Sequence, residues 1–370
     1  MPRIDAVELY HVRMPLVYPF TTAYGSDDVI ESILVKLISG NSYGWGEAQP
    51  FKAPTYCPEY SAGVLLMMRM YLVPAILGKQ IESGDELQDR WACFKGNHFA
   101  KGGIDMAWWD LYARRRGEPL WKVLGGLGPE VEVGADFGVM HSLDALLEKI
   151  DGAVRAGYTR VKLKYAPGWD LGMVAAVRKA FPRMTFHIDC NSGYRLSDLD
   201  MFRRLDEYGL AMIEQPLMHD DLIDHASLAR QIHTPICLDE SITSLDRARQ
   251  AIEIGACKWV NIKPVRVGGL TPALKINAYC MQAGVPCWVG GMLESALGAA
   301  HCLAMATLPN MKYPNDIFPS SRFYEKDLGR PEMKLSGPSR MTAAAVPGVG
   351  VEPDPEQLDR VTVQRVVMEA

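Results

Sequence analysis

The chain has 370 residues, of which 39 are basic and 44 acidic, giving a net charge of −5, and 48% are hydrophobic. This length predicts a barrel-sized core plus a second domain. The mild negative charge argues against nucleic acid or an anionic membrane as the main partner. No apolar run reaches the roughly 20 residues of a membrane-spanning helix. Residues 1–16 alternate apolar and polar side chains and lack a signal peptide's apolar core, so we expect a cytoplasmic protein.

Residues 1–130 predict an α+β domain. Strand-like segments at 4–14 and 32–39 come first, and helical segments rich in Leu, Met and Trp follow at 61–77 and 102–116. Strands followed by helices, rather than alternating with them, are typical of the α+β class.

Residues 131–320 instead alternate short apolar runs with helix-length segments. The six clearest runs are 160–164, 185–190, 211–216, 235–240, 259–264 and 286–291. Residues 131–139 form a first strand candidate and residues 311–316 a weaker last one. Glycines that should end the intervening helices are Gly157, Gly209, Gly255 and Gly284.

Repeated strand–helix units form a parallel sheet, and this many of them favour closure into a barrel. We therefore predict an α/β fold: a (β/α)7β barrel of the TIM type over residues 131–320, capped by the α+β domain. Residues 321–370, which contain many Pro and Gly, should pack back on that first domain.

Five of the predicted strands carry an ionisable residue at or near their C-terminal end. These residues recur every 24 or 25 positions and are Lys164, Asp189, Glu214, Asp239 and Lys263. The C-terminal ends of barrel strands are where reactive groups gather. A charge that closes a buried run is unfavourable unless it is paired or binds a metal.

Asp189, Glu214 and Asp239 should converge from three adjacent strands, where they would raise each other's pKa. A divalent cation resolves that conflict, and carboxylate ligands select a hard ion such as Mg²⁺, with Mn²⁺ as an alternative. The other interpretation is a set of strand-end acids bonded to neighbouring lysines.

Lys162 and Lys164 lie two residues apart, so both point to the same face of their strand. Near a metal, a buried lysine loses its proton more readily and can act as a general base. Lys263 would approach from the opposite side. A metal flanked by two lysines suits removal of the proton beside a carboxylate, because the metal and a protonated lysine can stabilise the enediolate that forms. The alternative is that the lysines only neutralise the acids.

The segments VKLK, IDCNSGY, MIEQPL, PICLDES, VNIKPVRVGG and GGMLESALG resemble the enolase superfamily over nearly the whole chain. The similarity is to its muconate-cycloisomerase-like branch, and within that branch to o-succinylbenzoate synthases and N-acylamino acid racemases. It implies that Lys164 is the base, Lys162 its partner and Lys263 the second acid/base. It further implies that Asp189, Glu214 and Asp239 bind the metal and that Asn191 supports them.

The resemblance also implies that two loops of the first domain, 18–26 and 48–56, cover a small carboxylate substrate. Candidate pocket residues on these loops are Phe20, Tyr24, Phe51 and Tyr56. Candidates on the far side of the barrel mouth are Trp288, Gly291, Met292 and Leu293. The alternative for the aromatic residues is ordinary packing between domains.

Asp136 departs from the pattern of close relatives, which carry a small hydroxyl residue at the corresponding position of the first barrel strand. An acid there would repel a succinyl carboxylate or accept a cationic group.

The resemblance implies Mg²⁺-dependent abstraction of the α-proton, by an o-succinylbenzoate synthase of menaquinone biosynthesis, an N-acylamino acid racemase, or both. It also implies a homo-oligomer, either a dimer or an octamer. A racemase or epimerase of another amino-acid derivative or a dipeptide is the nearest alternative. A Schiff-base aldolase would use Lys164 or Lys263 without a metal, and a non-catalytic descendant would have lost at least one of the six site residues.

Overall fold

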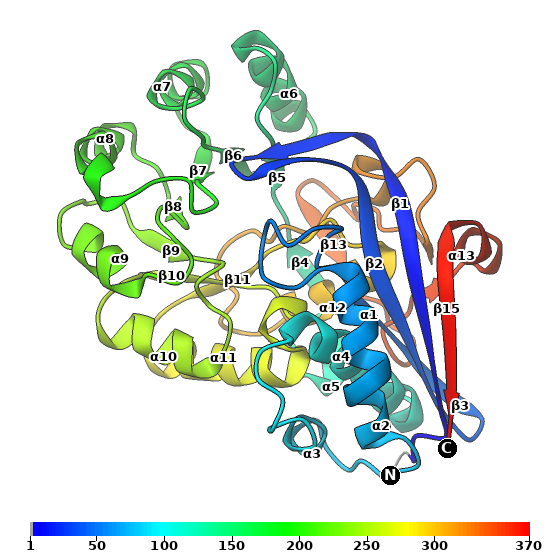
Figure 1. The fold of residues 1–370 in the computed structure, drawn as a ribbon. Coiled ribbons are helices and arrows are strands. Elements are labelled where there is room, and N and C mark those ends of the chain that lie inside the picture. The colour runs from blue at the N-terminus through cyan, green and yellow to red at the C-terminus, as the bar shows by residue number, and fades with distance from the viewer. Residues whose placement is uncertain (1–2) are drawn as a thin grey trace.

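A four-stranded antiparallel sheet begins the computed structural model, which describes residues 3–370. Its strands are β1 (Ala6–Thr22), β2 (Gly25–Ser39), β3 (Ser42–Ala48) and the C-terminal β15 (Thr362–Glu369), in the order β15-β1-β2-β3. Figure 1 shows β1 and β2 as two long, curved strands with β15 beside β1, so the two ends of the chain lie close together.

Helix α4 (His98–Arg116) packs directly on β3. Two glycines of β3 permit this approach. A Cβ atom on Gly44 would lie 2.2 Å from the backbone nitrogen of Leu111, and one on Gly46 would lie 2.2 Å from the carbonyl oxygen of Gly103. The helix is therefore seated against strand backbone, which explains why glycine is used inside a strand.

The helical segment predicted at 61–77 is not one continuous helix. It divides into α1 (Ser61–Met67), a π-helical turn η1 (Met68–Leu72) and α2 (Val73–Ile76). Pro74 supplies the physical reason, since proline lacks a backbone N–H and its ring displaces the carbonyl of the preceding turn. Two short helices, α3 (Gly84–Asp89) and α5 (Leu120–Val123), complete this part of the chain.

The barrel is a seven-stranded parallel sheet in chain order. Its strands are β5 (Ala135–Phe137), β6 (Arg160–Lys164), β7 (Thr185–Asp189), β8 (Ile213–Glu214), β9 (Ile236–Leu238), β10 (Trp259–Ile262) and β11 (Cys287–Val289). The helices between and after them are α6 (Leu143–Arg155), α7 (Leu171–Ala180), α8 (Leu199–Leu205), α9 (Leu222–Ala229), α10 (Leu245–Glu253), α11 (Leu270–Gln282) and α12 (Ala296–Ala306). Figure 1 shows α6 to α11 arranged in an arc outside these strands.

Residues 311–316 close the barrel as its eighth strand position. Met311 bridges Cys287 of β11 and Asn315 bridges Val133, which precedes β5, both in parallel orientation. Backbone hydrogen bonds join the segment to both neighbours, from Asp316 N to Val289 O and from Gly134 N to Asn315 O. The predicted (β/α)7β order is therefore confirmed.

The predicted first strand at 131–139 is divided. Residues Glu130–Glu132 form β4, which pairs antiparallel with β13 (Arg340–Thr342), and only Ala135–Phe137 joins the barrel as β5. Gly134 separates them, and a Cβ atom there would lie 2.2 Å from Cζ of the buried Arg160. The strand changes sheets where a guanidinium crosses its backbone.

The four predicted helix-ending glycines all adopt positive φ angles, which are 84° for Gly157, 57° for Gly209, 74° for Gly255 and 71° for Gly284. Glycine enters this left-handed region without a Cβ clash. Each turn lets a helix return the chain to the start of the next strand.

The end of the chain contains β12 (Gly329–Arg330) paired with β14 (Glu352–Pro353), then α13 (Pro355–Val361) and β15. The domain boundaries at residues 130 and 320 stay a prediction.

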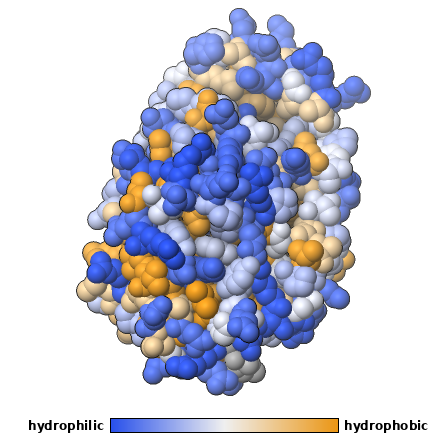
Figure 2. Space-filling view, turned by 90° about the vertical axis from the view of Figure 1, so that its right-hand side faces the viewer, coloured by the Kyte–Doolittle hydropathy of each residue, from blue (hydrophilic) through white to orange (hydrophobic). Residues whose placement is uncertain are grey.

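The side of the molecule that carries β1 and β15 is mostly hydrophilic, with scattered apolar patches (Figure 2). The predicted oligomer also stays a prediction. No helix within residues 3–370 is long and apolar enough to cross a membrane.

Two buried acids of the first 130 residues hold the starts of barrel helices. Glu47 of β3 accepts hydrogen bonds from Ser295 Oγ (2.6 Å) and from the backbone nitrogen of Gly298 (3.0 Å) at α12. Asp105 of α4 accepts one from the backbone nitrogen of Thr271 (3.0 Å) at α11. Carboxylates satisfy the free N–H groups of a helix N-terminus. These bonds join β3 to the start of α12 and α4 to the start of α11.

Candidate active site

Three carboxylates meet at the C-terminal ends of β7, β8 and β9. Asp189 and Glu214 end their strands in register with each other, and Asp239 directly follows β9. One oxygen of each lies within 4.8 Å of the others, and none of the three residues is more than 1% exposed. The predicted convergence therefore exists, and a buried acidic triad suitable for a metal ion is present.

The three predicted lysines surround this triad. Lys164 Nζ lies 2.7 Å from Asp189 Oδ2, and Lys263 Nζ lies 2.8 Å from Asp239 Oδ2. Lys162, one inward-facing position deeper in β6, lies 2.9 Å from both Asp189 and Glu214. Since β6 and β10 are separated by the three acid-bearing strands, Lys164 and Lys263 approach from opposite sides.

The carboxylates of this cluster are already matched by cations, because the three lysines contact them and the guanidinium of Arg266 also pairs with Asp239. Burial favours the neutral form of Lys162, but attraction by Asp189, Asp316 and Glu214 outweighs it and holds the pKa of Lys162 well above its usual range. Burial likewise raises the pKa of Asp189, yet Lys162 and Lys164 outweigh it and lower that pKa. A divalent cation placed among the acids would leave the cluster with an excess of positive charge. That excess favours release of a lysine proton and binding of an anionic substrate.

Glu214 is oriented by two inward-facing side chains from a deeper layer of the barrel. His187 lies 3.2 Å from Glu214 Oε2 through Nε2, while its Nδ1 lies 3.1 Å from the Tyr313 hydroxyl. Burial lowers the pKa of His187, so the imidazole is neutral and one ring N–H can donate to the carboxylate. Asn261 Nδ2 donates to Glu214 Oε1 at 2.7 Å. Such support fixes the direction of a ligand's lone pairs.

Asn191 has the supporting geometry expected of it. Its backbone nitrogen donates to Asp189 Oδ1 at 3.0 Å, and its side-chain amide donates to Glu240 Oε1 at 3.0 Å. Its φ of 42° turns the chain back over the strand end. Asn191 therefore links the loops that follow β7 and β9.

A narrow cavity that is partly open to solvent lies above the cluster. Most of the predicted pocket residues line it, together with the lysines and Asn191. Its lining is Phe20, Thr22, Tyr24, Asp27, Phe51, Asp136, Lys162, Lys164, Asn191, Lys263, Gly291, Met292, Leu293, Asp316 and Phe318. Two loops of the N-terminal sheet thus form one wall and the barrel strand ends form the floor.

The two parts of the chain match known families separately. The family described as mandelate racemase / muconate lactonizing enzyme, N-terminal domain, matches residues 4–125, and the family described as enolase C-terminal domain-like matches residues 145–357. The chain belongs to the enolase superfamily. This family membership confirms the predicted resemblance.

Relatives within the enolase superfamily match over the full length. The chain is 44% identical to o-succinylbenzoate synthase of Geobacillus kaustophilus over 361 residues, covering 97% of this chain and 96% of that one. It is 40% identical to N-succinylamino acid racemase of Thermus thermophilus, with 100% of both chains covered. The crystal structure of an enolase-superfamily member from Listeria innocua has a TM-score of 0.96 at 35% identity, with 100% of both chains covered.

Two predicted pocket residues of this enolase-superfamily chain lie outside the lining of that cavity. Tyr56 lies behind Lys263, whose Nζ donates to the Tyr56 hydroxyl at 3.2 Å. Trp288 lies deeper, in register with Asn261, and its indole N–H donates to Cys237 Sγ at 3.3 Å. Trp288 is fully buried, so it fills the barrel interior rather than closing the mouth.

Several residues around the cluster were missed from the sequence. Asp316 lies 3.1 Å from Lys162 and 2.7 Å from Arg160, at the end of the eighth strand position. His187 and Asn261 each precede a predicted site residue by two positions, which in a strand means the same face. Alternate residues of a strand face the same side, so considering the residue two positions before each predicted site residue would have identified both His187 and Asn261.

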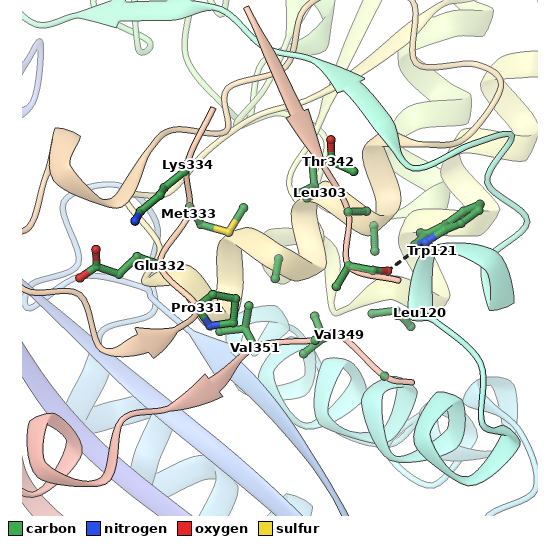
Figure 3. A pocket seen from close by; sticks show the side chains of 16 residues that line it. Leu120, Trp121, Leu303, Pro331, Glu332, Met333, Lys334, Thr342, Val349 and Val351 are labelled. Carbon is green, nitrogen blue, oxygen red and sulfur yellow. Dashed lines mark hydrogen bonds between the residues drawn. The ribbon is translucent and has the colours of Figure 1, made fainter. Parts of the chain in front are cut away.

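A second cavity lies elsewhere, between α5, α12 and residues 331–351 (Figure 3). Most of its lining is apolar, and Trp121 at one side donates its indole N–H to the carbonyl oxygen of Ala344 at 3.1 Å. Glu332 and Lys334 are the charged residues that line it. It lacks the convergent acids and lysines of the barrel mouth, so the chemistry belongs to the first cavity.

Proposed function

We propose that this chain removes the proton α to the carboxylate of a small-molecule substrate, with a divalent cation, Mg²⁺, held by Asp189, Glu214 and Asp239. One observation carries the proposal: a buried acidic triad whose oxygens lie within 4.8 Å of one another is flanked on opposite sides by Lys164 and Lys263.

The donor set fits a hard cation. Three carboxylates supply only oxygen ligands, which select Mg²⁺ or Mn²⁺ over softer metals. His187 and Asn261 fix the direction of Glu214, and Asn191 fixes that of Asp189. When bound, Mg²⁺ would supply positive charge beside the substrate carboxylate as negative charge develops on it.

The lysines divide the proton transfers between them. Lys164 accepts the α-proton on one face of the substrate, and Lys263 exchanges a proton on the other face. Lys162 remains protonated because three carboxylates surround it, and it contributes a fixed positive charge. Phe20, Phe51 and Met292 exclude water from the reacting centre.

Racemisation of an N-acylamino acid is the first candidate for the net reaction, and two opposed lysines permit it. Removal of a proton by one lysine and delivery by the other inverts the α-carbon. The similarity to N-succinylamino acid racemase over the full chain supports this assignment.

Synthesis of o-succinylbenzoate is the second candidate, supported by the relative of that name at 44% identity. There the enediolate would expel a neighbouring hydroxyl as water, with a protonated lysine as proton donor. The same two lysines serve either outcome, so substrate choice decides between them.

Hydrogen–deuterium exchange at the α-carbon tests the proposal. An N-acetylamino acid incubated in D₂O with Mg²⁺ should lose its α-proton signal in NMR spectra, and EDTA or the double variant Lys164→Ala/Lys263→Ala should prevent the loss. Lys258→Ala is the matched control, because Lys258 is exposed and precedes β10, at the opposite end of that strand from Lys263. Full exchange in EDTA would refute the metal's role. A substrate adduct trapped by borohydride in EDTA would favour a Schiff-base aldolase instead.

A further inference from the structure

Asp136 is a buried acid of the cavity that takes no part in the acidic triad. It lies on β5 in register with Lys162 of β6, so its side chain points into the barrel as Lys162 does. The residue is 5% exposed and lines the cavity, and its Oδ1 has no hydrogen-bond partner. A buried polar atom without a partner is unfavourable and calls for a ligand.

The cations near Asp136 are engaged elsewhere. Lys162 contacts Asp189, Glu214 and Asp316, and Lys164 contacts Asp189. Arg322 donates to the backbone carbonyl of Asp136 rather than to its carboxylate. Its guanidinium also lies 5.3 Å from the ring centroid of Phe137. Burial raises the pKa of Asp136, and Lys164 and Lys162 are close enough to oppose that rise, but within residues 3–370 its carboxylate forms no ion pair of its own and Oδ1 stays without a hydrogen bond.

A further acid lines this cavity. Asp27, from the N-terminal sheet, lines the same cavity, and Phe20 and Phe318 line it with apolar surface. A substrate held by its carboxylate at the triad would extend from β7 across β6 to β5. Two strand spacings, roughly 10 Å, separate β7 from β5. The four-carbon stem of a lysine-type side chain suits that span.

We propose that Asp136 is a specificity-determining residue that binds an ammonium or guanidinium group, so that the substrates are N-acyl derivatives of basic amino acids. The proposal rests on the proposed function, because the acidic triad places the substrate carboxylate. A second carboxylate directed at Asp136 would be repelled.

A matched pair of ligands tests the proposal. N-acetyl-L-lysine and N-acetyl-L-norleucine have similar chains, but only the lysine derivative carries a terminal charge. Calorimetric titration with Mg²⁺ should show the lysine derivative binding at least about tenfold more tightly to the wild type, as expected for a hydrogen bond to a charged group. Asp136→Asn should reduce the ratio of the two dissociation constants to about one. Asp136→Ser is the second variant, in case the first does not fold.

Asp28→Asn is the control, because Asp28 is exposed and adjacent to Asp27 but does not line the cavity. It should keep the wild-type ratio. A wild-type ratio near one, a ratio that survives in Asp136→Asn, or no binding of either ligand overturns the proposal.

Exchange of the α-proton separates this inference from the proposed function. Exchange of both ligands without a binding preference would overturn the role of Asp136 and keep the chemistry. A tenfold preference lost in Asp136→Asn, but without exchange of either ligand, would support the role of Asp136 and refute the chemistry.

Discussion

Replacing Glu47 by Gln should remove a pH dependence of folding stability that the junction between β3 and α12 creates. Glu47 is 1% exposed, and burial is the main cause that raises its pKa from 4.5 to about 7. Between these values the unfolded chain releases the Glu47 proton while the native chain retains it. The unfolded state then binds fewer protons, so the free energy of unfolding falls as pH rises. A shift of this size corresponds to about 3 kcal/mol, at about 1.4 kcal/mol per pKa unit.

The assay is urea unfolding of wild type and Glu47→Gln, followed by tryptophan fluorescence, at pH values from about 5 to 8. Gln keeps one oxygen that accepts the hydrogen bond from Ser295, and its amide can donate to the Ser32 hydroxyl, so the variant is close in shape but does not titrate. The free energy of unfolding of the wild type, minus that of the variant, should fall by about 2 to 3 kcal/mol across this range. A difference that stays constant or rises with pH would refute the reasoning.

Three further changes test other parts of the structure. Gly46→Ala should lower the free energy of unfolding by at least about 2 kcal/mol, because its Cβ would meet α4 backbone at 2.2 Å. The control Gly152→Ala, at an open and exposed helix position, should not destabilise the protein. Equal losses of unfolding free energy in the two variants would contradict the close packing. His187→Phe should weaken Mg²⁺ binding about 10- to 100-fold by calorimetry, since Glu214 loses an orienting partner; wild-type affinity would show that this contact is irrelevant. Tyr56→Phe should lower kcat/KM about tenfold or more through the loss of a hydrogen bond to Lys263, and an unaltered value would exclude a positioning role for that hydroxyl.

The barrel could be predicted because its repeat is regular. Lys164, Asp189, Glu214, Asp239 and Lys263 recur at nearly constant spacing, and one strand, one helix and two turns require about that many residues. The same regularity brought the acids and the two opposed lysines together. The period-two pattern within each strand also contained His187 and Asn261, but the prediction applied it only to Lys162 and Lys164.

Other features depend on contacts that no local pattern specifies. The division of residues 131–139 depends on where the Arg160 guanidinium crosses Gly134. The depth of Trp288 depends on its register with Asn261. The role of Asp316 depends on how the last segment closes the barrel against Val289 and Gly134. Each of these is set by long-range packing, which local periodicity does not report.

Stereospecific exchange by two single variants tests the central claim most directly. With Mg²⁺ in D₂O, the wild type should exchange the α-proton of both enantiomers of an N-acetylamino acid and interconvert them. Lys164→Ala and Lys263→Ala should each abolish racemisation while retaining exchange with one enantiomer, and the enantiomer should differ between the variants. Racemisation by either variant would contradict the assignment of the two lysines to opposite faces of the substrate.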